Sequence, residues 1–214
     1  MEAPPLRYLW FFLILLLALA ADFGGLLAAL FLGMAFIPAL LYLNWFRNFE
    51  KHDPEPWGAL YQAFFWGAIT GVIAAGIINS IFIVFVMLAA GVVVAEIVGA
   101  IIIAPFVEEF LKPVGIIRGG VRKEVDEVED GLIYGAACGL GFAATENLIY
   151  GWSVISEGVA VTAAVIIMRT FSSTLVHASA TAFTGHGLSR YLVHGDSRMT
   201  VFRYYLAAVG LHAF

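Results

Sequence analysis

Long apolar segments separated by short clusters of charged residues determine what this chain can fold into. A helix needs roughly 20 apolar residues to cross the hydrocarbon core of a bilayer. Seven segments approach or exceed this length, at about 6–21, 24–45, 58–88, 91–117, 131–151, 159–189 and 200 to the end. Because lipid offers no hydrogen-bond partner to open backbone groups, each segment is expected to be a helix. The sequence therefore predicts an all-α, polytopic transmembrane helical bundle.

The composition agrees with this class of fold. Hydrophobic residues make up 62% of the 214 residues and charged residues 13%, whereas soluble domains carry about 25% charged residues. The single cysteine, Cys138, excludes an internal disulfide and a metal site built from several cysteines. We expect one integral membrane domain over residues 1–214, with two spans in residues 1–45 and a core that carries the functional site in residues 58–214. The lipid bilayer is an expected partner and nucleic acid is not.

The distribution of positive charge predicts the orientation in the membrane. If the seven spans alternate in direction, one side of the membrane carries no Lys or Arg, and the other carries Arg7, Arg47, Lys51, Arg118, Arg122, Lys123, Arg190, Arg198 and Arg203. Loops rich in Lys and Arg remain on the cytoplasmic side. We therefore predict a multi-pass protein of the cell membrane with a cytoplasmic N-terminus. The first segment also resembles a signal peptide, and we interpret it as a retained span.

Several ionisable residues lie inside the predicted spans, where each costs about 2.5 kcal/mol or more and usually marks a functional site or a buried pair. In the fourth span, Glu108 and Lys112 are one helical turn apart, so Lys112 is expected to neutralise Glu108. Glu109 points about 100° away and is expected to need a partner on another helix. It is thus the first choice for activating water, with Glu108 second. Pro113 lacks the N–H that would bond the Glu109 carbonyl, which predicts a local opening of the helix.

The next two spans place polar residues on single helix faces. In the fifth span, an arc of about 80° holds Gly131, Gly135, Gly139, Phe142 and Glu146. In the sixth span, one stripe holds Arg169, Ser173, His177 and Thr184. Glycines on one face allow another helix to come close, so Glu146 is expected to face protein rather than lipid. Arg169 is expected to pair with a carboxylate, and His177 to act as a base or a ligand. His212, in the last span, is expected to face the same interior.

These residue types fit more than one kind of function. Buried carboxylates and histidines can activate a water for hydrolysis, either directly as a general base or by holding Zn²⁺. Carboxylates inside a membrane also form the proton relays of ion-coupled carriers, and a non-catalytic scaffold is a third alternative. The His-Glu-x-x-His sequence of zincins does not occur. The spacing by itself does not decide between a hydrolase and a carrier.

Three motifs, in order on consecutive spans, resemble those of the PrsW family of intramembrane proteases, relatives of the CAAX prenyl endopeptidases and the bacterial Abi proteins. The matching stretches are Glu108-Glu109-x-x-Lys112 for E-E-x-x-K, Phe142-x-x-x-Glu146 for F-x-x-x-E, and His177 for the histidine of the third motif. The resemblance covers roughly residues 45–214. In the CAAX relatives the second motif ends in His rather than Glu, which leaves open whether the site binds a metal.

The resemblance implies proteolysis of membrane-anchored protein substrates within or beside the bilayer, and in bacterial members the substrate class is an anti-sigma factor. By analogy, Glu108 or Glu109 activates the water. The expected catalytic residues are Glu108, Glu109, Glu146, His177 and Lys112, and the expected supporting residues are His212, Arg169, Phe142 and Asn147. Zn²⁺ is the candidate cofactor, and its expected ligands are Glu109, Glu146, His177 and His212.

Overall fold

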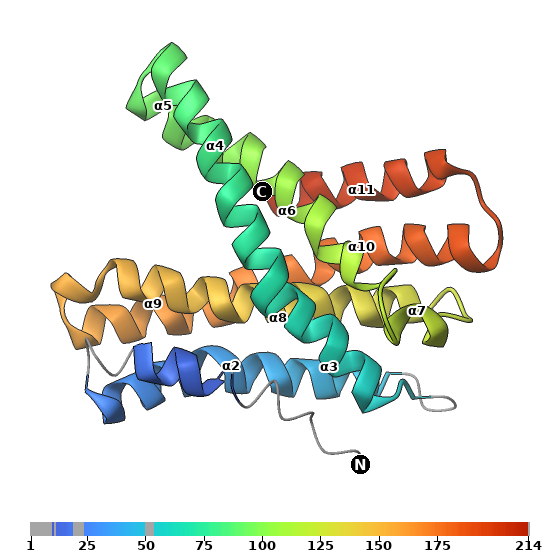
Figure 1. Ribbon diagram of the computed structural model, residues 1–214, viewed down its shortest axis with the longest axis horizontal. Coiled ribbons are helices and arrows are strands. Elements are labelled where there is room, and N and C mark those ends of the chain that lie inside the picture. The colour runs from blue at the N-terminus through green and yellow to red at the C-terminus, as the bar shows by residue number, and fades with distance from the viewer. Residues whose placement is uncertain (1–9, 11, 19–23, 50–53, 214) are drawn as a thin grey trace.

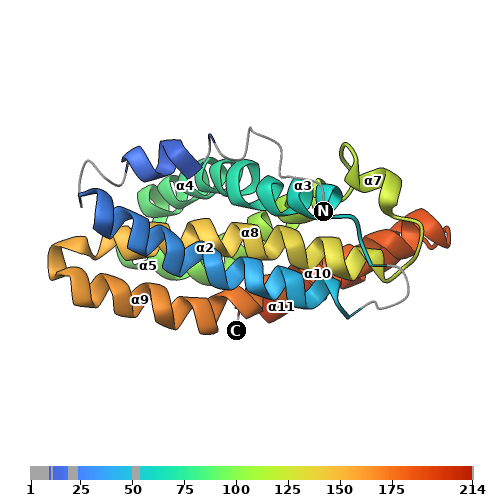
Figure 2. The same ribbon diagram turned by 90° about the horizontal axis from the view of Figure 1, so that it is seen from below.

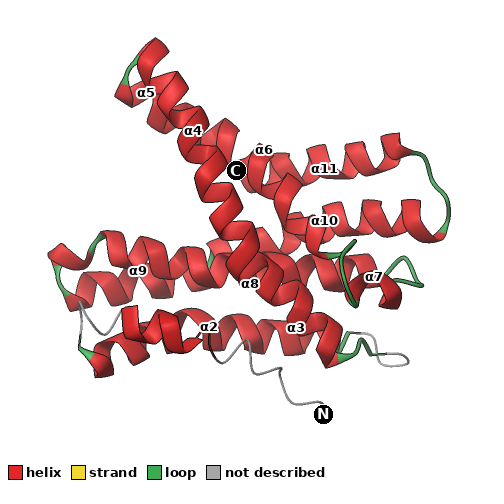
Figure 3. Ribbon diagram, in the orientation of Figure 1, coloured by secondary structure: helices red, strands yellow, loops and turns green. Residues whose placement is uncertain are grey.

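The computed structural model describes residues 10, 12–18, 24–49 and 54–213, and every regular element within these ranges is a helix (Figure 3). The elements are α2 (Gly25–Arg47), α3 (Trp57–Phe65), η1 (Trp66–Gly71), α4 (Val72–Ala90), α5 (Val92–Val98), η2 (Gly99–Ile103), α6 (Ala104–Leu111), η3 (Lys112–Gly115), α7 (Val121–Glu124), α8 (Asp130–Ser153), η4 (Ile155–Glu157), α9 (Val159–Phe171), α10 (Ser173–Val193) and α11 (Arg198–Ala213). The predicted all-α helical bundle is confirmed.

Four helical stretches of the described residues are long and apolar enough to cross a membrane, namely Gly25–Arg47, Trp57–Ala90, Asp130–Ser153 and Val159–Val193. They correspond to the predicted spans 24–45, 58–88, 131–151 and 159–189. The predicted span 91–117 is divided among α5, η2, α6 and η3, and the last predicted span is the 16-residue helix α11. Most of the first predicted span, 6–21, lies outside the described residues. The count of about seven spans is therefore approximate.

The helix α8 lies at the centre of the bundle (Figures 1 and 2). It packs most extensively against α10 and also against α2, α3, η1 and α9. Gly131, Gly135 and Gly139 face α10 so closely that a methyl group on any of them would overlap atoms of that helix. This close approach agrees with the packing role predicted for the glycines, and it places Glu146 of α8 beside His177 of α10.

The helix that carries the acidic pair changes its winding next to Pro113. The α-helical turn α6 ends at Leu111 and continues as the 3₁₀-helix η3, because a proline cannot donate the hydrogen bond that would continue an α-helix. Trp66 of η1 donates from Nε1 to the Leu111 carbonyl at 3.1 Å. The helix therefore changes its winding next to Pro113 by tightening into a 3₁₀ turn, and an indole N–H satisfies the Leu111 carbonyl. The predicted opening at the Glu109 carbonyl stays a prediction.

The helices α4 and α5 project from the rest of the bundle (Figure 1). Large apolar side chains on α4 are exposed, with Ile77 at 59%, Phe85 at 66% and Leu88 at 76%. Contiguous apolar exposure of this kind marks a surface that contacts lipid or protein rather than water. The end of α2, the short helix α7 and the α10–α11 turn all lie toward the right-hand side of the molecule in Figure 1.

Candidate active site

Lys112 lies at the centre of a buried group of ionisable side chains. Its Nζ lies 3.2 Å from Oε2 of Glu108 and donates to Oε1 of Glu109 at 2.8 Å. The same Nζ lies 2.8 Å from Nδ1 of His177 and 4.2 Å from the centre of the Phe142 ring. Lys112 and Glu109 are fully buried. Lys112 therefore neutralises Glu108 as the spacing predicts, and it also contacts Glu109.

Glu109 has partners on two other helices, as predicted. Thr181 of α10 donates from Oγ1 to its Oε2 at 2.9 Å, and Nδ1 of His212 in α11 lies 2.9 Å from its Oε1. With Lys112 on Oε1 as well, both oxygens of Glu109 have polar neighbours. This carboxylate consequently ties α6 to α10 and α11.

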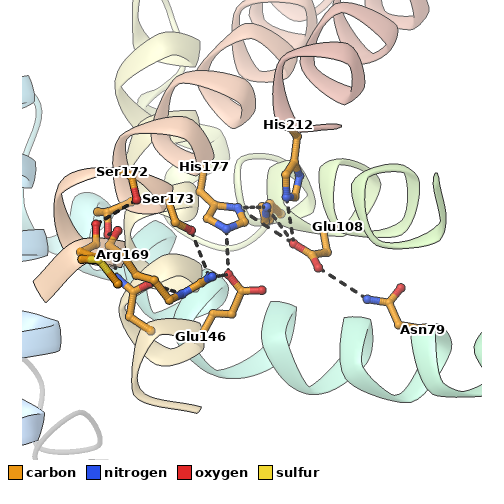
Figure 4. A network of polar contacts seen from close by, with 12 residues as sticks. Asn79, Glu108, Glu146, Arg169, Ser172, Ser173, His177 and His212 are labelled. Carbon is orange, nitrogen blue, oxygen red and sulfur yellow. Dashed lines mark hydrogen bonds and ion pairs between the residues drawn. The ribbon is translucent and has the colours of Figure 1, made fainter. Parts of the chain in front are cut away.

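His177 is held in one orientation by contacts at both ring nitrogens (Figure 4). A lysine ammonium is only a donor, so Nδ1 of His177 accepts the hydrogen bond from Lys112. In the neutral ring the proton then resides on Nε2, which donates to Oε2 of Glu146 at 2.8 Å. The ring of His212 packs edge-on against His177, with 4.5 Å between the ring centres.

Arg169 of α9 anchors the other side of the network (Figure 4). Its Nη2 donates to Oε2 of Glu146 at 2.6 Å and to Ser173 at 3.1 Å, while its Nε donates to Oδ1 of Asn147 at 3.1 Å. Asn147 in turn donates to Thr174 at 2.8 Å. The predicted pairing of Arg169 with a carboxylate is therefore found. The side chains of Arg169 and Glu146 are 23% and 17% exposed, so this part of the network is more open than the buried ammonium of the central lysine.

Glu108 differs from the other two carboxylates because one of its buried oxygens lacks a hydrogen-bond partner. Its Oε2 is buried and accepts no hydrogen bond, although the ammonium of Lys112 lies 3.2 Å away. Two imidazoles face this oxygen, with Nδ1 of His177 at 4.0 Å and Nε2 of His212 at 3.8 Å. The other oxygen, Oε1, accepts a long hydrogen bond of 3.5 Å from Nδ2 of Asn79. Buried polar atoms almost always have a partner, so Oε2 is where a water or a cation would be expected.

The same three residues offer ligand atoms to a metal ion. Ligand atoms of Glu108, His177 and His212 lie within 4.8 Å of one another. One carboxylate and two imidazoles form the protein ligand set of several catalytic zinc sites, in which ligands about 2.1 Å from the ion lie roughly 3.4 Å apart. The donor chemistry therefore fits zinc. Binding would require the three atoms to move closer together and Lys112 to give up its contact with Nδ1 of His177.

The structure brings all nine expected site residues into one connected network, consisting of Glu108, Glu109, Lys112, Phe142, Glu146, Asn147, Arg169, His177 and His212. The carboxylates expected to bind metal, Glu109 and Glu146, have other side-chain partners here. The sequence interpretation missed Asn79, although it is the only amide in the apolar helix Val72–Ala90.

Comparison with known proteins places this network in a family. Residues 55–214 match the family described as PrsW family intramembrane metalloproteases. The chain belongs to the PrsW family. The matched region contains every described residue of the network, from Asn79 to His212. Membership in the PrsW family and the four apolar helices together show that this chain is a membrane protein.

Individual PrsW proteins show the same relationship. Protease PrsW of Clostridioides difficile (strain 630) is 30% identical over 166 residues, which are 76% of this chain and 66% of the relative. Protease PrsW of Geobacillus kaustophilus (strain HTA426) is 29% identical over 114 residues, 53% of this chain and 48% of the relative. Protease PrsW of Bacillus subtilis (strain 168) is 29% identical over 123 residues, 57% of this chain and 52% of the relative.

The chain thus spans about half to two thirds of the length of these curated PrsW relatives. No solved structure matches it. The PrsW relatives are named as proteases, and the alternative of an ion-coupled carrier finds no support among them.

Proposed function

We propose that this chain is an intramembrane endopeptidase that hydrolyses membrane-anchored proteins with a water activated by Glu108. The observation that carries the proposal is the buried Oε2 of Glu108, which accepts no hydrogen bond and faces His177 and His212. A general base that takes a proton from a positioned water typically accelerates a reaction by about 10²–10⁴-fold. The match to the PrsW family supports peptide hydrolysis as the reaction.

The surrounding residues have different proposed roles. Glu109 holds Lys112 in place, because both of its oxygens already have polar neighbours. For this reason Glu108, and not the initially favoured Glu109, is the proposed water-activating residue. Lys112 supplies positive charge beside the reacting water, and its position is fixed before reaction, as electrostatic stabilisation requires. Glu146 orients His177 through the hydrogen bond to Nε2.

Zn²⁺ is the proposed cofactor of the site. Glu108, His177 and His212 would hold it, and a bound zinc would supply a water that ionises near neutral pH. In the zinc-bound enzyme Glu108 would serve as a ligand of the ion that activates the water, and only its metal-free carboxylate would take the proton itself. The charge balance supports a cation here, since the three carboxylates of the network face only two permanently charged side chains, Lys112 and Arg169. Buried negative charge without a compensating positive charge is strongly unfavourable.

The orientation and the substrate class are also part of the proposal. Arg47 ends α2, Arg122 lies in α7 and Arg198 begins α11, and these three positions lie toward the same end of the molecule (Figure 1). Loops rich in Lys and Arg remain cytoplasmic, so this end would face the cytoplasm, with the N-terminus on the same side. Residues 1–214 would form one integral domain. The resemblance makes an anti-sigma-factor-like membrane protein the first substrate to examine.

Cleavage of a single-span substrate in proteoliposomes tests the proposal. Wild-type protein should release a shorter product, and Glu108→Gln should reduce the rate by about 100-fold or more because the amide cannot take a proton. Glu96→Gln makes the same chemical change at an exposed position of α5 and should retain the wild-type rate. Equal cleavage by wild type and Glu108→Gln would contradict the role of Glu108, and absence of any cleavage by wild type would contradict peptidase activity.

A further inference from the structure

Asn79 brings an amide from the apolar helix α4 to the side of Glu108 that faces away from the histidines (Figure 4). Its Nδ2 lies 3.5 Å from Oε1 of Glu108, and its Oδ1 is buried without a hydrogen-bond partner. A carboxylate only accepts hydrogen bonds, so the NH₂ group of Asn79 is the one that must face Glu108. The neighbouring Ser80 instead donates to the carbonyl of Gly76 in its own helix at 2.7 Å.

We propose that Asn79 is a positioning residue, whose N–H holds Oε1 of Glu108 and thereby directs Oε2 toward His177 and His212. The inference rests on the proposed function of Glu108. The two oxygens of a carboxylate share one rigid plane, so a hydrogen bond to one of them sets the direction of the other. Carboxylates in metal and catalytic sites are commonly oriented by such outer partners, and removal of the partner costs about 10–100-fold in activity or metal affinity.

A purely structural role predicts a different result. The helix α4 packs against α6, so the bond between Asn79 and Glu108 could serve only to hold these two helices together. Hydrogen bonds between membrane helices contribute only about 0.6 kcal/mol on average, and leucine is favoured over asparagine in a lipid-facing helix. If holding the helices together were its only role, Asn79→Leu would leave stability unchanged or higher and kcat near the wild-type value. A large fall in kcat without a loss of stability therefore distinguishes positioning from packing.

Four variants of the full chain in proteoliposomes test the inference. Asn79→Leu should lower kcat by about 10–100-fold with KM within about twofold of wild type. Asn79→Asp should lose at least as much activity, because a second carboxylate repels Glu108. Asn79→Gln keeps the NH₂ group and should retain more activity than Asn79→Leu. Ser80→Ala, on the same helix, should match wild type because Ser80 bonds only within α4.

A second measurement keeps this test separate from that of the proposed function. Thermal unfolding of Asn79→Leu should occur at or above the wild-type temperature. Wild-type kcat in Asn79→Leu, or a fall in kcat that follows a loss of stability, would overturn the positioning role and leave the peptidase proposal standing. If the wild type cleaves nothing, the peptidase proposal fails, and an experimental structure of Asn79→Leu then tests positioning directly. The carboxylate of Glu108 should rotate away from the histidines, and an unchanged carboxylate would overturn the inference.

Discussion

Nε2 of His177 lies 2.8 Å from Oε2 of Glu146, so a carboxylate on α8 fixes an imidazole on α10. This contact depends on the close approach of the two helices, which Gly135 and Gly139 permit because any side chain there would overlap α10. Packing and chemistry are therefore coupled in this protein. The residues that let the helices meet also determine where the ring of His177 points.

Glu146 and His177 should behave as one unit in catalysis. Glu146→Ala and His177→Asn are each expected to lower the cleavage rate by about 10–100-fold, because the first removes the acceptor that orients the ring and the second removes the ring itself. The double variant should be little worse than the poorer single variant, since residues that act together are not additive. Cleavage rates for the four proteins of this cycle measure the coupling. Fully multiplicative losses would show that the two residues act independently.

Arg169 should be required for more than its charge. It bonds Glu146 and Asn147 through two different nitrogens, a fork that lysine cannot reproduce. Arg169→Met should lower the cleavage rate by about 10–100-fold, as expected for a residue that supports the orienting carboxylate. Arg169→Lys should give an intermediate rate. Wild-type rates in Arg169→Met would refute this role. Ser172→Ala is the control for a nearby change in the same helix pair, because the Ser172 hydroxyl donates only to the Met168 carbonyl.

Adding a methyl group at Gly139 should both destabilise the bundle and displace His177. A Cβ at this position would lie 2.8 Å from the carbonyl carbon of His177 and 2.9 Å from Cα of Ala178. Forcing extra volume into such a contact typically costs about 1–3 kcal/mol. Gly76→Ala is the matched control, because a Cβ there has no atom within 4 Å. Unfolding free energies in detergent should fall for Gly139→Ala and stay level or rise for Gly76→Ala; equal stability would contradict the packing account.

Zinc should bind through Glu108, His177 and His212. Removing the metal with a chelator should abolish cleavage, and added Zn²⁺ should restore it. His212→Ala removes one of three ligands and should reduce zinc affinity at least about 10-fold, since even outer partners of a metal site contribute about that much. His194→Ala, in the α10–α11 turn, is the histidine control. Zinc binding that is equal in wild type and His212→Ala would remove His212 from the site.

Much of the fold could be predicted because the membrane constrains it strongly. Apolar length alone located the four long helical stretches, and the 3.6-residue period placed Glu146 on the glycine face of α8. The stretch between α4 and α8 was harder to predict. Gly91 and Pro113 interrupt its α-helical winding, and π-helical and 3₁₀ turns replace a single continuous span.

The details of the site depended on contacts that helical periodicity does not encode. Spacing identified the pair of Glu108 and Lys112, but Glu109 also reaches Lys112 and receives a hydrogen bond from Thr181, which is 72 residues away in sequence. Because of this contact we propose Glu108, and not Glu109, as the residue that activates water. Asn79 was not predicted for the same reason. Its partner Glu108 is 29 residues away in sequence, and a single amide in a helix forms no periodic pattern.

The most direct test of the account compares Glu108→Gln with Glu109→Gln, measuring cleavage rate and unfolding free energy on the same samples. Glu108→Gln should lose about 100-fold or more in rate while its unfolding free energy stays within about 1 kcal/mol of wild type, because Lys112 keeps Glu109 as a partner. Glu109→Gln should also lose up to about 3–5 kcal/mol of stability. Lys112 keeps Glu108 in this variant, but the change removes the charge of a fully buried carboxylate that also contacts Thr181 and His212. A Glu108→Gln protein that is stable and cleaves at the wild-type rate would contradict the account.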